Sequence, residues 1–245
     1  MATVIWNQEE ASSNFDANWA AMAAQRYAAT ELRTATGDPT GNVRFFGRMM
    51  FPHLFEPHKM EGAQGKPSYS TMVAFIPGYD LTLLANMLKA KQAEKWPKGA
   101  PAHHKVALRK QDEKFDESGQ SRLAGMQRGG YFTTVSSTAF DKNNNPLPGP
   151  KLVRMVDKQI ITDRTEIYPG CWGLFVCNPY NFDAPANCGT KFGLQMFIKV
   201  FDDKPLGGGG RVTTDQALQD LDIGDFDAAE GGANVASTVD DLMGV

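Results

Sequence analysis

The chain has 245 residues, of which 42% are hydrophobic and 22% are charged, with a formal net charge of -3. This composition supports a buried core and excludes a chain that is disordered throughout. The sequence has no apolar run as long as a membrane-spanning helix requires and no signal-peptide pattern at its N-terminus, so we expect a soluble protein.

Charge is distributed unevenly along the chain. Residues 212–245 contain eight acidic residues and neither Lys nor Arg, whereas residues 37–211 contain 23 basic and 16 acidic residues, a net charge of +7. The sequence therefore predicts a basic body that attracts a polyanion and an acidic tail that competes for the same surface.

The first predicted element is a helix over residues 15–33. This segment is rich in Ala, and its larger apolar side chains recur at spacings of three and four, which is typical of an amphipathic helix. The helix is expected to pack on the main domain, because its polar face is not basic enough for a membrane surface. The segment TGDPTGN at 36–42 then breaks the chain.

The first predicted strand, NVRFFGRM, begins at Asn42. Alternation along it places Phe45 on one face and Arg44, Phe46 and Arg48 on the other. We expect the second face to be the outer one, where a mixture of aromatic and basic side chains is unusual. Removing Phe46 should then leave the core intact.

The remaining predicted elements are mostly strands. They cover residues 68–76, 131–140, 152–161, 171–182 and 191–201, and a helix over 81–96 follows the possible N-cap Asp80. Short strands, long loops and one helix between early strands favour a mainly β fold, a five-stranded barrel of the OB type. Four glycines at 207–210 precede a tail that we expect to be disordered. The predicted parts are an N-terminal helical extension at 1–36, a binding domain at 37–211 and an acidic tail at 212–245.

The sequence gives weak signals for catalysis or metal binding. The four glycines lack the Lys-Ser or Lys-Thr of a phosphate-binding loop. The candidate metal ligands have no zinc-site spacing, and the cysteines are too few for a disulfide scaffold, which fits a reducing compartment. These residues are His53, His58, His103, His104, Cys171, Cys177 and Cys188. We expect no catalytic residue, cofactor or metal.

Basic and aromatic side chains together indicate single-stranded nucleic acid, since bases stack on rings while Lys and Arg neutralise phosphates. Packing under the N-terminal helix or the long loops is the alternative for each ring. The candidate DNA-binding residues are Arg44, Phe46, Arg48, Lys66, Tyr69, Lys105, Arg109, Lys110, Arg128, Tyr131, Lys151, Arg154, Tyr180, Lys191 and Phe197.

Six segments, taken in order, resemble a family of bacteriophage proteins. They are FPHLFEP (51–57), GKPSYSTMVAFIP (65–77), KVALRKQDEK (105–114), GGYFTTVSS (129–137), IYPGCWGLFVCNPYNF (167–182) and KPLGG (204–208). That family is similar to the OB-fold single-stranded DNA-binding proteins of phages. The resemblance covers about residues 40–211, and no single motif carries it alone.

The resemblance implies a sequence-independent single-stranded DNA-binding protein of phage replication or recombination, working in the cytoplasm of the infected host. It also implies a tail that recruits replication proteins such as a polymerase, helicase, primase or nuclease. The chain ends in Leu-Met-Gly-Val, where several such proteins have an aromatic residue, and DIGDF at 222–226 is a possible equivalent. The candidate partner-binding residues are Asp222, Asp225, Phe226, Asp240 and Asp241. Two alternatives stay open: a non-catalytic interaction scaffold, and a metal-dependent nucleic-acid enzyme that uses the histidines.

Overall fold

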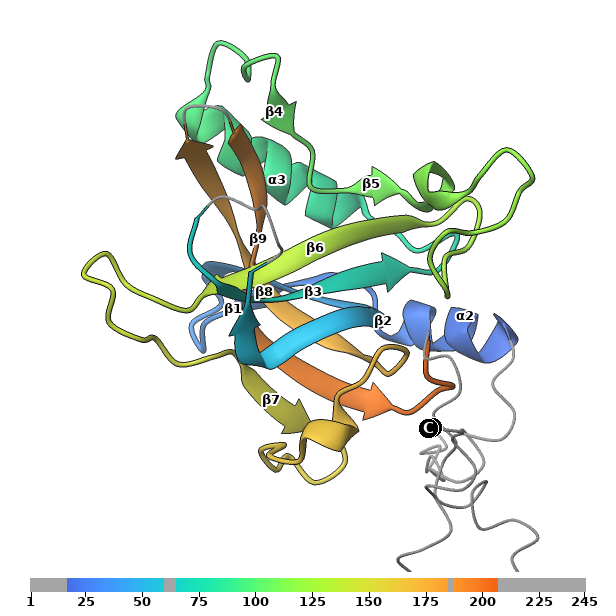
Figure 1. Ribbon diagram of the computed structural model, residues 1–245. Helices are drawn as coiled ribbons and strands as arrows, with labels where there is room; N and C mark the ends of the chain where they lie inside the picture. The colour runs from blue at the N-terminus through green and yellow to red at the C-terminus, as the bar shows by residue number, and fades with distance from the viewer. Residues whose placement is uncertain (1–16, 60–64, 185–186, 207–245) are drawn as a thin grey trace, which may run out of the picture. The chain divides into compact units, whose positions relative to one another are not determined.

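The computed structural model describes residues 17–59, 65–184 and 187–206 (Figure 1). Its elements, in chain order, are α2 (Ala17–Arg26), β1 (Thr30–Arg33), β2 (Pro39–His58), β3 (Ser68–Phe75), α3 (Thr82–Lys95), β4 (His104–Lys105), β5 (Arg109–Lys110), the 3-10 helix η1 (Gln111–Lys114), β6 (Tyr131–Thr138), β7 (Lys151–Arg154), the 3-10 helix η2 (Arg164–Glu166), β8 (Trp172–Ala184) and β9 (Asn187–Phe201). In this part of the chain no helix is both long and apolar enough to cross a membrane.

Five strands close into a barrel. β2 pairs with β3 on one side and β8 on the other, β3 pairs with β6, and β8 pairs with β9, all antiparallel. A parallel pairing of β6 with β9, Val135 to Phe192 and Ser136 to Gly193, joins the two ends of the sheet. The five-stranded OB-type barrel is confirmed, and α3 between β3 and β6 is the predicted helix between early strands.

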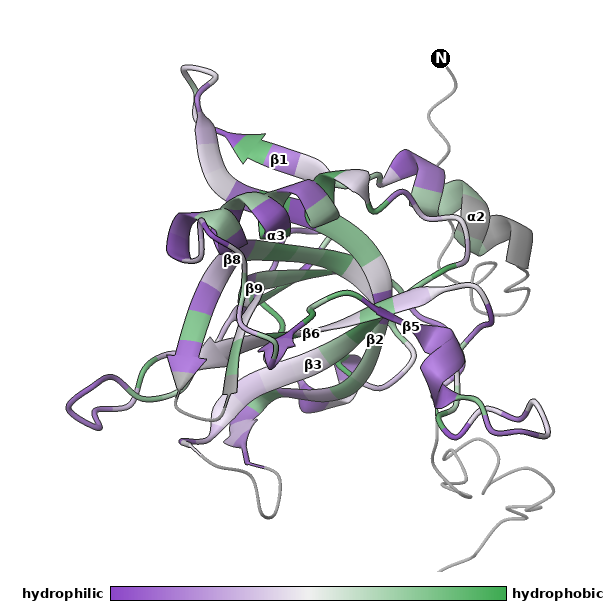
Figure 2. Ribbon diagram, turned by 90° about the horizontal axis from the view of Figure 1, so that it is seen from above, coloured by the Kyte–Doolittle hydropathy of each residue, from purple (hydrophilic) through white to green (hydrophobic). Residues whose placement is uncertain are grey.

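Phenylalanines fill the interior of the barrel. The ring of Phe45 lies at the centre, with centroids 5.5 Å from Phe192, 5.6 Å from Phe75 and 5.9 Å from Phe175. Figure 2 shows the hydrophobic colouring concentrated on the barrel strands and the hydrophilic colouring on several of the loops. Burying each such side chain stabilises the fold by about 1.5–3 kcal/mol.

A second apolar cluster lies outside the barrel, under α2. Phe46 stacks on Trp172 at 5.3 Å and lies 6.0 Å from Phe201. The hydroxyl of Tyr79 accepts the N–H of Phe46 and donates to the carbonyl of Tyr27, just after α2, so it ties the two elements together. The buried α2 side chains in this cluster are Ala20, Ala23 and Ala24.

The N-terminal helix is shorter than predicted. It ends at Arg26, and Thr30–Arg33 forms β1, which pairs with the start of β2. A turn joins these two strands, with Gly37 at φ +93° and its carbonyl accepting from Arg33. The turn residues of TGD therefore make a hairpin, and this hairpin prevents the helical pattern from continuing to Arg33.

One strand prediction also needs correction. The strand predicted over 152–161 ends at Arg154, because the chain turns at Lys158, which has φ +60°, and Ile160 pairs back with Val153. In β9 the alternation breaks at Gln195: Cys177 pairs with Leu194 and Val176 pairs with Met196, so Gln195 is an extra residue. Such a bulge changes which later residues face the core.

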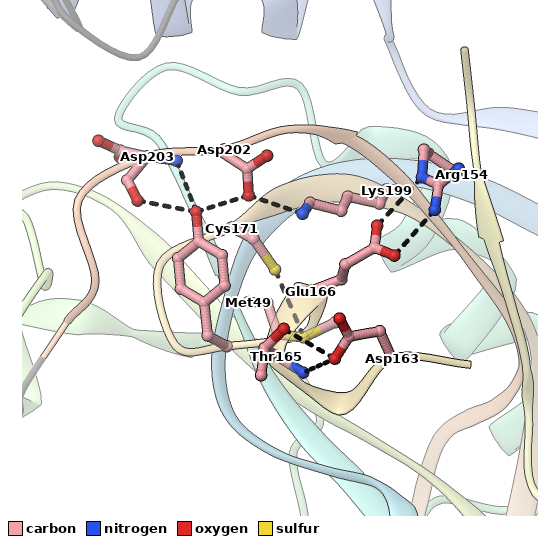
Figure 3. A network of polar contacts seen from close by, with 10 residues as sticks. Met49, Arg154, Asp163, Thr165, Glu166, Cys171, Lys199, Asp202 and Asp203 are labelled. Carbon is pink, nitrogen blue, oxygen red and sulfur yellow. Dashed lines mark hydrogen bonds and ion pairs between the residues drawn. The ribbon is translucent and has the colours of Figure 1, made fainter. Parts of the chain in front are cut away.

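A polar network fixes the end of β9 to the barrel (Figure 3). Asp202 forms an ion pair with Lys199 at 2.6 Å and accepts from the hydroxyl of Tyr168 at 2.7 Å. Burial, followed by the hydrogen bond to Asp202, raises the pKa of Tyr168 far above its ordinary value. Nearby, Glu166 pairs with Arg154 at 2.8 Å. These contacts hold the segment that leads to the C-terminal tail.

Candidate nucleic-acid interface

The outer side of β3 and β6 has a floor of small side chains. Strand register places Ser70 beside His53 of β2, Ser136 beside Ser70, and Gly193 of β9 beside Ser136. Val135 and Phe192 face the core, so their neighbours in this row face outward. The row consists of small residues, of which Ser136 is only 9% exposed and Gly193 lies close to the ring of Tyr180. In OB folds this strand face and the adjoining loops bind oligonucleotides.

One end of this floor carries an aromatic platform. β8 and β9 continue as a two-stranded arm, on which the ammonium of Lys191 lies 5.5 Å from the ring centroid of Tyr180 and 5.2 Å from that of Phe182. A Cβ atom on Gly189 would lie 2.7 Å from Phe182, and one on Gly193 would lie 3.3 Å from Tyr180. Each ring therefore lies close against the backbone opposite it and is half-buried; a Cβ atom on Gly189 would clash with Phe182, and one on Gly193 would crowd Tyr180.

Helix α3 holds the arm from its other face. The side-chain amide of Asn181 donates to the carbonyl of Lys91 at 2.7 Å and accepts from the hydroxyl of Thr190 at 2.7 Å. Lys95 forms an ion pair with Asp183 at 2.9 Å. Because side chains alternate along β8, Asn181 and Asp183 lie on one face of the strand, and Tyr180 and Phe182 lie on the other face. The arm is thus preorganised, with its platform turned away from α3.

Two stacked imidazoles lie at the β2 end of the floor. The rings of His53 and His58 are 4.2 Å apart and nearly parallel, at 16°. Burial first, and then the neighbouring His58, lowers the pKa of His53 below its ordinary value. The stacked rings offer flat faces to a base.

A basic rim borders β6. The guanidinium of Arg109 lies 5.3 Å from the ring centroid of Phe132, and the ammonium of Lys114 lies 5.4 Å from it. Arg128 covers Phe115 at 4.6 Å in the same way. This rim brings several predicted phosphate contacts together: Lys105, Arg109, Lys110 and Arg128 are all exposed or half-exposed along the segment that precedes β6.

Two predicted stacking residues are buried, and these predictions are corrected. Phe46 is on the outer side of β2, as the alternation predicts, but α2 and Trp172 cover it and its exposure is 1%. Phe197 has 0% exposure, because the bulge at Gln195 turns it into the barrel. Neither ring offers a face to a base.

Two predicted phosphate contacts are engaged with acids, and their assignment is also corrected. The guanidinium of Arg48 pairs with Asp203 at 2.5 Å, and both side chains are nearly buried. Burial lowers the pKa of Arg48, although Asp203 partly offsets this effect. Arg154 pairs with both Glu166 and Asp157. Arg48 is thus held inside the fold, and Arg154, one-third exposed, is shared between two carboxylates.

The remaining predicted residues are spread over several surfaces. Arg44 lies where β2 pairs with β1 and β8, Lys151 is exposed on β7, and Lys66 donates to the carbonyl of Asp141. Tyr69 is half-buried and would contact a Cβ atom placed on Gly149. The arm and the rim gather Tyr180, Lys191, Lys105, Arg109, Lys110, Arg128 and Tyr131.

Sequence reasoning missed Phe182, the histidine stack and the serine floor. Phe182 had a usable signal, since it is two residues beyond Tyr180 and therefore shares its face of the strand. The pairing of Ser70 with Ser136 depends on strand register, which the sequence does not show. The predicted partner-binding residues, Asp222, Asp225, Phe226, Asp240 and Asp241, lie outside the described residues.

Comparisons with known proteins point to one family. A family model described as the ssDNA-binding protein of Enterobacter phage Enc34 matches residues 40–226. The solved structure of the single-stranded DNA-binding protein from bacteriophage Enc34 in complex with ssDNA has 19% identity and a TM-score of 0.51, over 69% of this chain and 90% of that one. A further structure of that phage protein has 20% identity and a TM-score of 0.51, over 78% and 98% of the two chains. Among curated proteins, no sequence matches.

Proposed function

The chain belongs to the family of the Enterobacter phage Enc34 ssDNA-binding protein, and we propose from this premise that it binds single-stranded DNA without sequence preference on the outer face of β3, β6 and the arm. The observation that carries this proposal is the platform in which Lys191 lies beside the rings of Tyr180 and Phe182. That group combines two surfaces for stacking with one cation for a phosphate.

The chemistry of the platform suits unpaired nucleotides. Stacking a base on an aromatic side chain contributes about 1–3 kcal/mol and tolerates any base, because every base has a π-face. The cations of the rim, Lys105, Lys110 and Arg128, would neutralise phosphates and release counterions. In a duplex the bases are stacked on one another, so the rings of the platform favour a single strand.

A titration tests this function. The full chain is mixed with oligo-dT, oligo-dC, a mixed sequence and a duplex over a range of salt concentrations, and intrinsic fluorescence reports binding. We expect similar affinities for the three single strands, weaker duplex binding, and an affinity that falls as salt rises. Duplex binding as tight as single-strand binding, or an affinity indifferent to salt, would contradict the proposal.

We propose that the protein acts by binding alone, in phage DNA replication or recombination within the host cytoplasm. Members of the family are described as binding proteins, which supports a non-catalytic role. An assay for strand cleavage with added Mg²⁺ or Zn²⁺, and with EDTA as the control, checks this. Metal-dependent cleavage that is lost when the histidines are substituted would favour the enzyme alternative.

We also propose a role for the acidic segment after Arg211. Its eight acids follow four glycines, and a polyanion tethered to a basic body competes with phosphates at high effective concentration. Truncation after Arg211 should leave the domain at 37–211 folded, tighten ssDNA binding most at low salt, and abolish association with replication proteins. Unchanged affinity at low salt would remove the competition model, and retained association would remove the recruitment model.

A further inference from the structure

A pocket of about 640 Å³ lies between the segment that links β4 to β5 and the start of β6. Its lining is made of Lys105, Val106, Leu108, Arg109, Lys110, Glu113 and Tyr131. This volume falls within the range of small-ligand sites. The pocket lies within the basic rim, apart from the serine floor and the aromatic platform, and it gives three rim residues, Lys105, Lys110 and Tyr131, a common cavity.

The pocket adjoins the platform directly. Lys105 pairs with Gly189 in the parallel β4–β9 ladder, and the ring of Phe182 lies over the same glycine. At the other side, Lys110 pairs with Tyr131 at the beginning of β6. A ligand that leaves the platform past Phe182 therefore meets Lys105 and then the pocket.

The lining combines an apolar surface with three cations and one carboxylate, that of Glu113. Val106 is 67% exposed and Tyr131 is 36% exposed, so both present apolar surface to a ligand in the pocket. Arg109 is paired with Glu113, whereas Lys105 and Lys110 have no acid at ion-pair distance among the described residues. Two uncompensated cations beside an apolar wall complement a group that is both flat and anionic.

We propose that this pocket binds one nucleotide of the single strand, with the base against Tyr131 and Val106 and the phosphate between Lys105 and Lys110. This inference rests on the proposed function and extends it, because the strand would then be bound by insertion of a nucleotide in addition to stacking on the open arm. A nucleotide matches the flat apolar wall, the cations and the continuity with Phe182 together.

A matched pair of substitutions in the full chain tests the inference. Val106→Asp places an acid in the pocket. Val156→Asp places the same acid on another exposed valine, after β7, where the exposure is 78% compared with 67% for Val106. Oligo-dT titrations should show about a tenfold loss of affinity for Val106→Asp, comparable to the loss of one stacked base, and no loss for Val156→Asp. Both valines are exposed, so neither change opens a core cavity.

A second pair of variants tests the stacking contribution of Tyr131 without changing any charge. Tyr131→Phe keeps a ring and should bind oligo-dT like the wild type, whereas Tyr131→Leu removes the ring and should bind several-fold more weakly. Equal thermal unfolding midpoints for the two variants would confirm that the fold is unchanged. If Tyr131→Leu loses stability, the Val106 pair still decides the test.

Three outcomes would overturn or relocate the inference. Equal oligo-dT affinities for Val106→Asp and Val156→Asp would show that no nucleotide enters the pocket. Tighter binding by Val106→Asp would show that the acidic tail of the chain occupies the pocket, since an acid there would expel the tail. A wild-type protein that fails to bind oligo-dT at all would instead contradict the proposed function.

Discussion

Aromatic rings gather on two outer faces of the barrel, and only one of these faces is open. Under α2, Phe46 and Trp172 stack at 5.3 Å and are almost completely buried. On the arm, Tyr180 and Phe182 are half-buried and lie on either side of Lys191. Both faces combine aromatic with basic residues in the sequence, so composition alone does not separate a packing surface from a binding surface.

The two faces differ in whether an acidic side chain pairs with the basic residue beside the rings. The guanidinium of Arg48 lies 5.5 Å from the ring centroid of Trp172, and the same guanidinium forms an ion pair with Asp203. Among the described residues, no acid lies within ion-pair distance of Lys191. A charge already paired with an acid has little to gain from a phosphate, whereas the uncompensated charge on the arm is available. The comparison assigns stability to the α2 face and recognition to the arm.

The largest expected effect is the loss of stability when a ring is removed from the face covered by α2. Phe46→Ala should reduce the free energy of unfolding by about 3–5 kcal/mol, because it leaves a cavity between α2 and Trp172. Denaturant unfolding measures this change. The folded fraction should bind oligo-dT like the wild type, and normal stability with weakened binding would reverse the roles of the two faces.

The next largest effect is expected from breaking the ion pair between Arg48 and Asp203, which lies beside Trp172. Arg48→Met leaves Asp203 nearly buried; within the described part of the chain, the indole N–H of Trp172, at 2.9 Å, is then its remaining side-chain donor. Removing one partner of such a pair should cost about 3 kcal/mol. Thermal and denaturant unfolding measure the loss, and an unchanged midpoint would show that the pair contributes little to the fold.

On the arm the expected effect is on binding instead of stability. Tyr180→Ala and Phe182→Ala should each weaken oligo-dT binding by about 1–3 kcal/mol, the range for one stacked base. Their unfolding midpoints should stay close to that of the wild type, in contrast to Phe46→Ala. A large loss of stability with unchanged affinity would show that these rings serve only to pack on Gly189 and Gly193.

The smallest effect is electrostatic. Lys191→Met should reduce the slope of log affinity against log salt by about 0.7, the value for one phosphate contact on a single strand. Lys89→Met removes an exposed lysine from α3 and is the control, since α3 lies behind the arm. A slope that changes equally in both variants would indicate only a general effect of net charge.

Much of the fold could be predicted because it depends on local patterns. Alternation identified the barrel strands, and it even assigned Phe45 and Phe46 to opposite faces correctly. Residues 30–33 were assigned wrongly to the helix, because Thr30–Arg33 becomes a strand only through its pairing with β2. Long-range pairing of this kind is not encoded in the local period.

The candidate site could be predicted only in part. Tyr180 and Lys191 were identified from composition, and the structure brings them together across the arm. Phe46 was assigned to the surface because nothing in its own strand indicates that α2 covers it. Phe197 was assigned to the surface because a single extra residue, Gln195, reverses the alternation beyond it.

A crystal structure of the full chain with oligo-dT tests the central claim most directly. The account predicts bases stacked on Tyr180 and Phe182, a phosphate near Lys191, and a strand that crosses the serine floor of β3 and β6. The cluster of Phe46, Trp172 and Phe201 should stay closed under α2. A strand bound in place of α2 on that cluster, with the arm free of DNA, would contradict the assignment of the two faces.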